Sequence, residues 1–556
     1  MKLSKILMGA FFALAITACS DEPMGESTKH KPGEGNEEPD TEVPQEPSEE
    51  PDDDIESPIP TFSMNTQSMS VNMGRTYQEI EGFGASDCWL PNTIGTYWTN
   101  DRAQLARWLF SKNINAAGQP QGIGLSVWRV NLGAGTAEIG EASGINNDNA
   151  NNRAESYLSG SSYDWNKCVG QRYFMQEALS NGVEGFVLFS NSPLVQYTLN
   201  GQGRSDNGGY ANLKEDCYDD FAEYMADVAQ HFTSLGYPIV AISPVNEPQY
   251  NWEGNSQEGS GWQNDEVAKL SRELDKALTQ RGLNTEISIG EAGSWSSLYE
   301  GGSGRERTIN AFYNPNSSAY VGDLAHIGNI ICGHSYWTHF NWNDMRTSRQ
   351  KVADAASPYN LRVWQTEWSM LDAAPEDVDY DAPDGEWQIA QYMSRVIHND
   401  LTVANCTSWS YWTAMSVERY SQRNRFELIK TTPVGGNYSN DFTKGGKIED
   451  TPNLWVLGNY SLFIRPGYVR VGLTHTESKN FFASAYLAPD NSKLVVVVTN
   501  YDKEKGALLK LTTPEGTKAI YTYTTTATKK LEQTRFNVKD QVFVDPSSVT
   551  TIVYYL

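Results

Sequence analysis

Short apolar runs alternate with stretches of helical periodicity through the middle of the chain. Eight runs stand out, at residues 80–86, 124–131, 184–190, 238–245, 287–292, 330–336, 361–367 and 406–412. Several are apolar without a break, as strands of a parallel sheet are when both faces are covered. The stretch 218–235 repeats its apolar residues every three or four positions, which is typical of an amphipathic helix. An eightfold alternation of strand and helix predicts the α/β class and a (β/α)8 TIM barrel.

The pattern changes at about residue 463. The runs 494–499, 519–526 and 551–556 are rich in β-branched residues and are separated by turn residues such as proline, aspartate and glycine. Closely spaced strands with such turns indicate a β-sandwich side domain. Residues 61–73 also look like a strand, and this strand could join the sandwich from the other end of the chain.

The first sixty residues have the composition of an export signal and a tether. Two lysines and the apolar run 6–16 lead to Cys19, a pattern typical of a signal peptide and too short to span a bilayer. The Ile-Thr-Ala-Cys ending resembles a bacterial lipobox, which implies cleavage before Cys19 and lipidation of its thiol. The alternative is a signal whose cysteine is incidental. Residues 20–60 hold 15 acidic residues, 2 lysines and 8 prolines, which predicts a disordered, extended tether.

These patterns divide the chain into five regions. We expect a lipoprotein signal peptide over 1–19, an acidic tether over 20–60, one or more sandwich strands over 61–80, the barrel over 81–462 and the C-terminal sandwich over 463–556. The acidic residues directly after Cys19 resemble the surface-export signals of Bacteroidetes-type lipoproteins. This resemblance implies an outer-membrane lipoprotein exposed at the cell surface, with the membrane as a partner through the lipid anchor.

Charge and composition narrow the range of ligands. The formal net charge is −26, which argues against nucleic acid and anionic lipid, because both require cations on the protein. Half of this charge comes from the tether, so it says little about the ligand of the folded part. The 16 Trp, 29 Tyr and 19 Phe residues supply cores first, but such flat faces also suit neutral, ring-shaped ligands. We expect a monomer that acts on a polysaccharide or oligosaccharide.

Two glutamates close apolar strands of the predicted barrel. Glu247 lies near the end of the fourth run, in Asn246-Glu247-Pro248, and Glu367 ends the seventh. Pro248 favours an extended conformation for Glu247 and stops the strand there. Polar residues at the carboxyl ends of barrel strands lie at the active-site face, so we expect the two carboxyls to face each other.

Facing carboxyls of this kind suit the cleavage of a glycosidic bond. Glu247 would protonate the leaving oxygen, while Glu367 would attack the anomeric carbon and form a covalent glycosyl-enzyme. Water would then hydrolyse the ester with retention of configuration, which requires carboxyls only about 5–5.5 Å apart.

Several motifs resemble glycoside hydrolase family 30. Beside the two glutamates they are EGFGAS (81–86), WRVNLG (128–133), SNSP (190–193) and SLFIRPG (461–467). The resemblance implies a barrel fused to a β-sandwich that takes strands from both termini, with no metal and no organic cofactor. PQYNW (248–252) followed by QEG (257–259) looks most like the endo-β-1,6-galactanase branch, whose substrate is the β-1,6-galactan side chain of arabinogalactan. The sequence departs from many relatives after Pro193, which affects subsite detail.

Polar neighbours of the glutamates are candidate substrate contacts. The resemblance implies that Asn246 bonds a sugar 2-hydroxyl, and it adds Asn191 to the site. Arg129 would either keep Glu367 ionised or serve only as a structural ion pair. Tyr336 could donate to Glu367, and His334 could line the same wall. His334 and His339 have a spacing that metals sometimes use, but no third ligand supports a metal site.

Aromatic residues provide candidate sugar platforms. At least one of Trp409, Tyr411 and Trp412 on the eighth strand should form a floor for a sugar ring, while alternation packs the others in the wall. Trp89 and Trp252 are candidate outer platforms, with ordinary loop packing as the alternative. Asp87 could hold a sugar hydroxyl or cap the following helix.

Two other functions stay open at this point. The same catalytic residues could act on β-1,6-glucan or a xylan. A non-catalytic glycan-binding lipoprotein would need aromatic platforms but no facing acids, so carboxyls more than about 10 Å apart would favour it.

Overall fold

The computed structural model describes residues 54–371, 373–419 and 424–556. The predicted signal peptide, Cys19 and the tether as far as residue 53 lie outside the described residues. All described residues belong to one compact unit. The last residues of the predicted tether contact the sandwich, because Asn537 donates to the Ser57 hydroxyl and to the Ile55 carbonyl.

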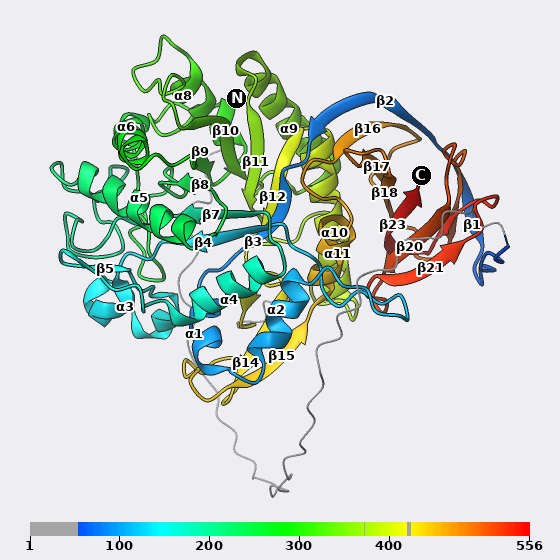
Figure 1. Cartoon of the computed structure of the whole chain (residues 1–556), viewed down its shortest axis with the longest axis horizontal. Helices are drawn as coiled ribbons and strands as arrows, with labels where there is room; N and C mark the ends of the chain where they lie inside the picture. Colours follow the sequence, from blue (N-terminus) through cyan, green and yellow to red (C-terminus); the bar gives the residue numbers. More distant parts are fainter. Residues whose placement is uncertain (1–53, 372, 420–423) are drawn as a thin grey trace, which may run out of the picture. The chain divides into compact units, whose positions relative to one another are not determined.

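Eight parallel strands close into a barrel in the spatial order β10-β11-β12-β3-β4-β7-β8-β9 (Figure 1). Their bounds are β3 Gly82–Ser86, β4 Val127–Asn131, β7 Gly185–Phe189, β8 Ile239–Ser243, β9 Glu286–Ala292, β10 Ile327–His334, β11 Arg362–Glu367 and β12 Cys406–Tyr411. Six of the eight apolar runs contain one of these strands, and β9 and β10 begin one and three residues before the fifth and sixth runs. The predicted α/β class and (β/α)8 barrel are therefore confirmed.

Helices cover the outside of the barrel. They include α1 Leu90–Tyr97, α2 Arg102–Phe110, α4 Val169–Ser180, α5 Tyr218–Ser234, α6 Asn264–Arg281, α8 Thr308–Tyr313, α9 Trp342–Ala356 and α10 Gly385–Thr402. In α5 the buried stripe that contains Phe221, Met225 and Phe232 follows the predicted spacing. In α6 a capping box between Gln263 and Glu266 begins the helix.

A small apolar layer fills the barrel below its mouth. Val127, Val187, Ala241, Ile330, Cys332 and Trp364 form a buried cluster of their own. On β4 Val127 and Arg129 lie two residues apart, so their side chains share the inner face of the strand. Arg129 therefore points into the barrel one layer above Val127, at the carboxyl end where an active site is expected.

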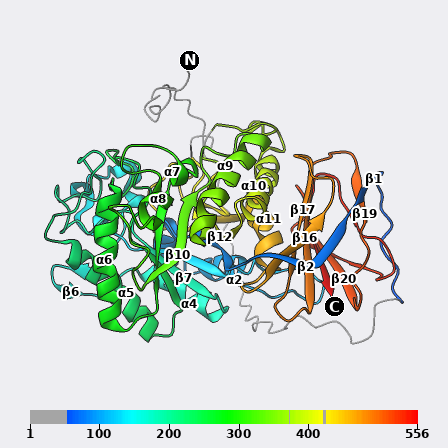
Figure 2. The same cartoon turned by 90° about the horizontal axis from the view of Figure 1, so that it is seen from above.

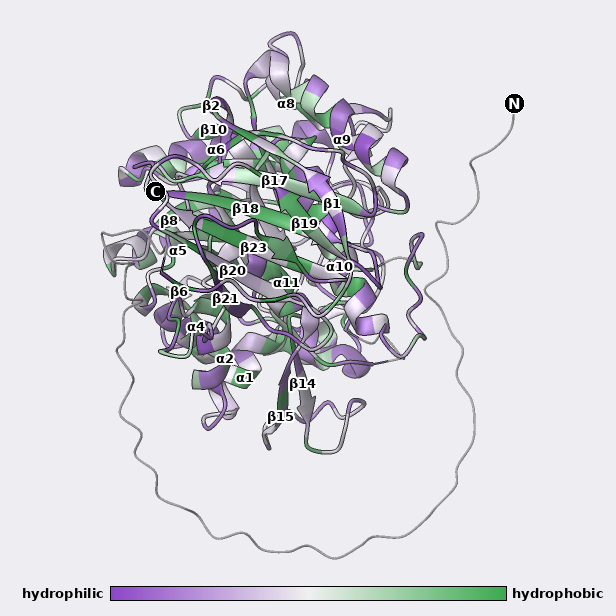
Figure 3. Ribbon diagram, turned by 90° about the vertical axis from the view of Figure 1, so that its right-hand side faces the viewer, coloured by the Kyte–Doolittle hydropathy of each residue, from purple (hydrophilic) through white to green (hydrophobic). Residues whose placement is uncertain are grey.

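The second domain is a β-sandwich that takes strands from both ends of the chain. Its seven-stranded sheet has the order β2-β16-β17-β18-β23-β20-β21, and its three-stranded sheet has the order β1-β19-β22. The bounds are β1 Met64–Ser68, β2 Ser70–Glu79, β16 Val469–Thr474, β17 Phe481–Leu487, β18 Lys493–Asn500, β19 Gly506–Lys510, β20 Ala519–Thr525, β21 Glu532–Phe536, β22 Phe543–Val544 and β23 Ser548–Tyr555. In Figure 1 β2 runs beside β16, and Figure 3 shows the central β18 and β23 as hydrophobic.

Two helices join the sandwich to the barrel. α10 and α11 (Pro452–Ser461) lie between the barrel strands and the seven-stranded sheet (Figure 2). Gln391 on α10 donates to the carbonyl of Asn500 at 3.0 Å, and Asn459 on α11 donates to the carbonyl of Tyr523 at 2.9 Å. These buried amide contacts fix the sandwich against the barrel wall.

Some features lie outside the sequence predictions. The loop after β12 carries a small sheet of β13 Met415–Ser416, β14 Ile429–Pro433 and β15 Gly446–Asp450. The five described cysteines, from Cys88 to Cys406, are free thiols. Among the described residues, none of the helices combines the length and the apolar composition that crossing a bilayer requires.

Candidate active site

The two predicted glutamates meet at the carboxyl end of the barrel. Glu367 is the last residue of β11, whereas Glu247 lies four residues beyond the end of β8. Both are buried, with 5% and 7% of their surface exposed. One carboxylate oxygen of each, together with a ring nitrogen of His334, lies within 4.8 Å of the others. Residues that are 120 positions apart in the sequence therefore share one small site.

The backbone at Glu247 differs from the sequence prediction. We expected Pro248 to hold Glu247 in an extended conformation, but its φ is +42°. The cause is a turn after β8. The Glu247 N–H donates to the Glu291 carbonyl at 2.9 Å, and the Glu247 carbonyl accepts from Tyr250 N–H and Trp252 Nε1 at 3.0 and 3.1 Å. Such strained backbone persists only where neighbouring contacts fix it, and it occurs often at functional sites.

Glu367 is surrounded by hydrogen-bond donors. Its Oε2 accepts from Arg129 Nη1 at 3.1 Å, and its Oε1 accepts from the Tyr336 hydroxyl at 3.2 Å. His334 Nδ1 lies 3.8 Å from the same Oε1. Burial raises the pKa of Glu367, while the positive charges of His334 and Arg129 act in the opposite direction.

His334 bridges two carboxyl groups. Its Nδ1 lies 3.0 Å from Glu247 Oε1, and its Nε2 lies 3.0 Å from Glu291 Oε2. Burial alone would lower the pKa of His334. The negative charge of Glu367 and the hydrogen bonds with Glu247 and Glu291 outweigh burial and raise this pKa to about 10. The ring is therefore an imidazolium that donates from both nitrogens at neutral pH.

Glu291 is a site residue that the sequence analysis missed. It lies near the end of β9 and is fully buried. Its carboxylate accepts from Arg129 at 3.2 Å, from the Thr366 hydroxyl at 2.7 Å, and from His334 and Ser243. Burial would raise the pKa of Glu291, but the Arg129 charge and these donors lower it to about 2. Its position in the sequence could have identified it, because Glu291 is a third glutamate at the carboxyl end of a predicted barrel strand.

Arg129 connects the members of the cluster. Nη1 donates to Ser86 and Glu367, each at 3.1 Å, while Nη2 donates to Asn246 and Glu291, each at 3.2 Å. The guanidinium carbon also lies 3.6 Å from the ring centroid of Phe189. Arg129 therefore contacts Glu367 and also forms a buried ion pair with Glu291, while its role in keeping Glu367 ionised stays a prediction.

The donor set of this cluster suits a proton better than a metal ion. An imidazolium has no free lone pair, so His334 cannot ligate a metal while it donates to Glu247 and Glu291. His339, the other histidine of the spaced pair, is buried away from the cluster, with Nδ1 3.3 Å from the Ser335 carbonyl. Burial lowers the pKa of His339 to about 3. The cluster therefore sets two cations, Arg129 and His334, against the carboxyl groups of three glutamates.

On the eighth strand, Trp409 does not form the sugar platform that the sequence allowed. Trp409 is fully buried, and its Nε1 donates to Asp400 of α10 at 2.9 Å, so Trp409 faces the helices and not the mouth. Tyr411, two residues on, is buried on the same face. Alternation along the strand explains this, and it leaves Trp412 as the aromatic residue on the mouth side. The partly buried Trp412 meets Trp89 edge to face, with ring centroids 5.3 Å apart.

Asp87 does not cap the following helix. α1 begins after Trp89 without a side-chain cap. The Asp87 carboxylate instead accepts from the Asn131 N–H and from Gln171 Nε2, both at 2.8 Å. Burial raises the pKa of Asp87 to about 7. Both oxygens serve the protein, and the predicted contact of Asp87 with a sugar hydroxyl stays a prediction.

Two remaining candidates lie beside the cluster. Asn191 Nδ2 donates to Asn131 Oδ1 at 3.2 Å, while its own Oδ1 is buried without a hydrogen-bond partner among the described residues. Trp252 is partly exposed and hydrogen-bonded to the carbonyl of Glu247, and its ring lies 5.5 Å from that of Tyr250. The structure therefore brings Arg129, His334 and Tyr336 to Glu247 and Glu367. Asp87 and Asn191 instead contact Asn131. Trp89, Trp252 and Trp412 are partly exposed.

Comparisons with known proteins agree with this arrangement. The profile of O-glycosyl hydrolase family 30 matches residues 66–425. An endo-β-1,6-galactanase of Hypocrea rufa is 28% identical over 352 residues, which are 60% of this chain and 64% of that protein. A glucuronoxylanase of Bacillus subtilis is 21% identical over 53% of this chain and 56% of its own length. The alignments thus span less than two thirds of these curated relatives.

Solved structures show the same fold. A conserved exported protein from Bacteroides fragilis superposes with a TM-score of 0.81 and 30% identity, covering 87% of this chain and all of that one. The catalytic domain of a GH30 xylanase from Talaromyces cellulolyticus superposes with a TM-score of 0.62 and 20% identity, over 88% of this chain and all of its own.

Proposed function

Because the chain belongs to O-glycosyl hydrolase family 30, we propose that it is a retaining glycoside hydrolase that cleaves β-1,6-galactan through a covalent glycosyl-enzyme. One observation carries the proposal: carboxylate oxygens of Glu247 and Glu367 lie within 4.8 Å of each other. Retaining enzymes place their carboxyls about 5–5.5 Å apart, whereas inverting enzymes need about 6.5–9.5 Å to admit a water molecule. The short gap supports direct attack by a carboxylate.

The hydrogen bonds around the pair support one role for each glutamate. Glu367 accepts from Arg129 and Tyr336, and donors of this kind favour the ionised form. Glu247 accepts from His334 alone among the side chains of the described residues, through Oε1. The carboxylate with more donors suits the nucleophile, and the one with fewer donors suits the acid. Glu367 is the nucleophile, and Glu247 is the acid.

The reaction then proceeds in two balanced steps. Glu367 attacks the anomeric carbon as Glu247 gives its proton to the leaving oxygen, which forms an ester and breaks the glycosidic bond. Glu247, now a carboxylate stabilised by the charge of His334, takes a proton from water. The resulting hydroxide equivalent attacks the same carbon and releases Glu367, and the two inversions give net retention.

The choice of galactan rests on similarity and on three partly exposed tryptophans. The Hypocrea rufa relative is named for activity on β-1,6-galactan. Trp252, which donates to the Glu247 carbonyl, and the paired Trp89 and Trp412 offer partly exposed rings, as a neutral sugar chain needs. β-1,6-Glucan and xylan are the alternatives within the same chemistry. A purely glycan-binding role is disfavoured, because it does not require two acids this close.

The test is hydrolysis of de-arabinosylated arabinogalactan, compared with β-1,6-glucan and β-1,4-xylan. We expect β-1,6-linked galacto-oligosaccharides that appear first as the β-anomer in proton NMR. Initial release of the α-anomer would overturn the retaining mechanism. Release of sugar only from glucan or xylan would overturn the substrate and leave the mechanism intact.

We also propose that the protein is exported and anchored to the outer membrane through Cys19. The lipobox-like ending and the acidic residues after it support this proposal. In a Gram-negative host, Cys19→Ala should move the protein from the membrane fraction to the soluble fraction. An unchanged membrane fraction would contradict the anchor.

A further inference from the structure

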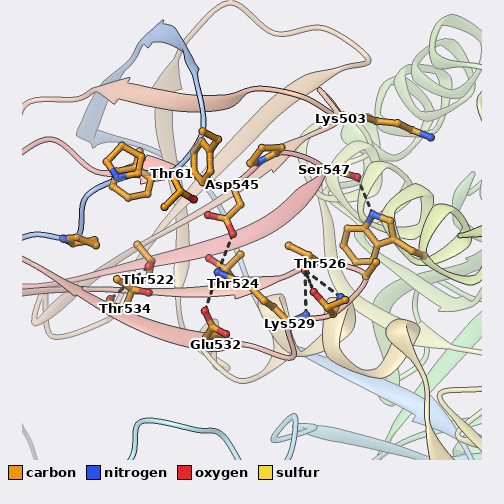
Figure 4. A pocket seen from close by; sticks show the side chains of 18 of the residues that line it. Thr61, Lys503, Thr522, Thr524, Thr526, Lys529, Glu532, Thr534, Asp545 and Ser547 are labelled. Carbon is orange, nitrogen blue, oxygen red and sulfur yellow. Dashed lines mark hydrogen bonds and ion pairs between the residues drawn. The ribbon is translucent and has the colours of Figure 1, made fainter.

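A cleft of about 730 Å³ opens in the sandwich, away from the glutamate pair (Figure 4). It lies where β20 and β21 of the large sheet face β22 of the small sheet, with residues 58–62 and the start of α10 at its border. Phe536 and Phe543 close its inner end, with ring centroids 5.2 Å apart. The lining of this sandwich cleft shares no residue with the catalytic cluster, so the mechanism does not account for it.

Hydroxyl groups dominate the walls of the sandwich cleft. They come from neighbouring positions on both strands and from the border, as Figure 4 shows: Thr61, Thr522, Thr524, Thr526, Thr534 and Ser547. Thr522 and Thr524 lie on one face of β20, because they are two residues apart. Thr522 and Thr524 are buried, and their hydroxyls already bond the Thr534 carbonyl and the Thr550 hydroxyl. The accessible hydroxyls of the cleft are therefore those at its edge and border, on Thr61, Thr526, Thr534 and Ser547.

Flat apolar surfaces also line the cleft. Phe62 and Phe543 contribute partly exposed rings and meet edge to face at 5.7 Å, whereas Trp387 is buried at the border. Trp387 is held in place by its Nε1, which donates to the Ser547 hydroxyl at 2.9 Å. A ligand with hydroxyl groups on one side and C–H groups on the other matches such walls.

The charged groups of the cleft compensate one another. Lys529 Nζ lies 2.8 Å from Glu532 and 3.0 Å from Asp545, and Lys503 lies 3.5 Å from Asp384. Two cations face three carboxylates, so the cleft has no excess positive charge that would bind an anion. The carboxylates are already paired with lysines, so they bind a further cation only weakly. The walls therefore favour a neutral ligand that is rich in hydroxyl groups.

We propose that the sandwich cleft binds a segment of neutral polysaccharide, as a second glycan site apart from the catalytic one. The volume lies within the usual range of ligand sites, about 300–1,000 Å³. A chain held at both places is bound with avidity, because the second contact becomes intramolecular. The proposal extends the proposed function, which concerns only the catalytic mouth.

The test uses the whole chain with Glu367→Ala, which prevents turnover. Native gels that contain β-1,6-galactan, β-1,6-glucan or β-1,4-xylan give an apparent Kd from the retardation. Thr534→Arg places a long charged side chain in the cleft from the half-buried edge strand β21. We expect it to weaken binding to the retarding polysaccharide at least threefold. Thr66→Arg, on the exposed face of β1 outside the cleft, is the matched control and should change nothing.

The outcomes separate the two proposals. Equal retardation of the Thr534→Arg and Thr66→Arg chains in all three gels would overturn the second site, as would the absence of any retardation. If Thr534→Arg does not fold, Thr526→Arg at the turn after β20 replaces it. If Thr534→Arg weakens binding only to glucan or xylan, and the unaltered chain does not hydrolyse galactan, the cleft stands and the proposed substrate fails.

Discussion

The pockets around Glu291 and Glu258 are both closed to solvent, yet they hold their carboxyl groups in opposite charge states. Glu258 lies on the loop between β8 and α6, and its Oε1 accepts from the Ala134 N–H at 3.1 Å and from the Thr136 hydroxyl at 2.5 Å. With only neutral donors near it, burial raises the pKa of Glu258 to about 8. Arg129 and His334 lower the pKa of Glu291 to about 2.

The difference shows what the catalytic cluster requires. Burial penalises a carboxylate in both pockets, and only paired cations reverse the penalty. In the barrel mouth an arginine and a histidine both bond Glu291, although Glu291 contacts no reacting atom in the proposed mechanism. That arrangement fixes Arg129 against Glu367 and His334 against Glu247. Glu258 ties two loops together as a neutral acid.

The largest expected effect concerns the nucleophile of the charged pocket. Glu367→Ala should lower kcat on the order of 10⁴-fold or more, because no other group can form the ester. Sodium azide should restore turnover and give a glycosyl azide of inverted configuration. The same measurement on Glu258→Gln should show kcat close to that of the unaltered chain. Wild-type-like activity of Glu367→Ala would refute the mechanism.

The second effect concerns stability and compares two isosteric changes. Glu291→Gln leaves Arg129 and His334 buried without their shared anion, and it should cost about 3–5 kcal/mol in the free energy of unfolding. Glu258→Gln replaces a neutral acid with a neutral amide, so its cost should be within about 1 kcal/mol. Urea unfolding of both variants at pH 7 measures the difference. Equal costs would mean that the two pockets do not differ in charge.

The sequence predicted the barrel well because its strands are continuous apolar runs. Glu247 and Glu367 were found because each closes such a run beside a landmark, Pro248 and Trp368. Glu291 was missed because Ile-Gly-Glu-Ala reads as the inside of a strand, and only the folded barrel brings it to Arg129 and His334.

The remaining errors have one physical origin. Whether Trp409 faces the mouth or the helices depends on strand register, which a sequence period of two leaves undetermined. The turn at Glu247 depends on the Glu291 carbonyl, which comes from another strand. The two protein donors that occupy Asp87, from Asn131 and Gln171, also come from other elements. Contacts between elements decided each of these details.

A third prediction uses pH to sharpen the contrast. The unfolded chain releases the Glu258 proton near the ordinary pKa of 4.5, and the folded chain releases it near pH 8. The folded state holds more protons between these values, so Glu258 makes stability fall as pH rises from 5 to 8, by about 2–4 kcal/mol. Glu291 acts in the opposite sense, because its contribution is present above pH 4.5 and is lost as pH falls towards 2.

Unfolding by urea at pH 5, 6, 7 and 8 measures this linkage. Between pH 5 and 8 the free energy of unfolding of the Glu258→Gln chain should fall less than that of the unaltered chain. The difference between the two falls is the contribution of Glu258. Glu427 is the matched comparison, because burial also raises its pKa to about 8, and Glu427→Gln should reduce the fall in the same way. Identical pH dependence in the variants and the unaltered chain would show that these carboxyls are ionised when folded.

The smallest effect concerns a single donor to Glu367. Tyr336→Phe removes the hydroxyl that lies 3.2 Å from Oε1. A hydrogen bond to a charged group contributes about 1.5–3 kcal/mol, so kcat should fall about 10- to 100-fold with little change in KM. The carboxylate loses a donor that favours its ionised form, so the pKa of Glu367 should rise and the acid limb of the kcat–pH profile should move to higher pH.

Tyr411→Phe is the control, since its hydroxyl donates to the Arg425 carbonyl on the outer face of β12 and its loss should leave that limb in place. An unmoved acid limb in Tyr336→Phe would mean that the donors around Glu367 do not set its charge, and that the contrast with Glu258 is one of burial alone.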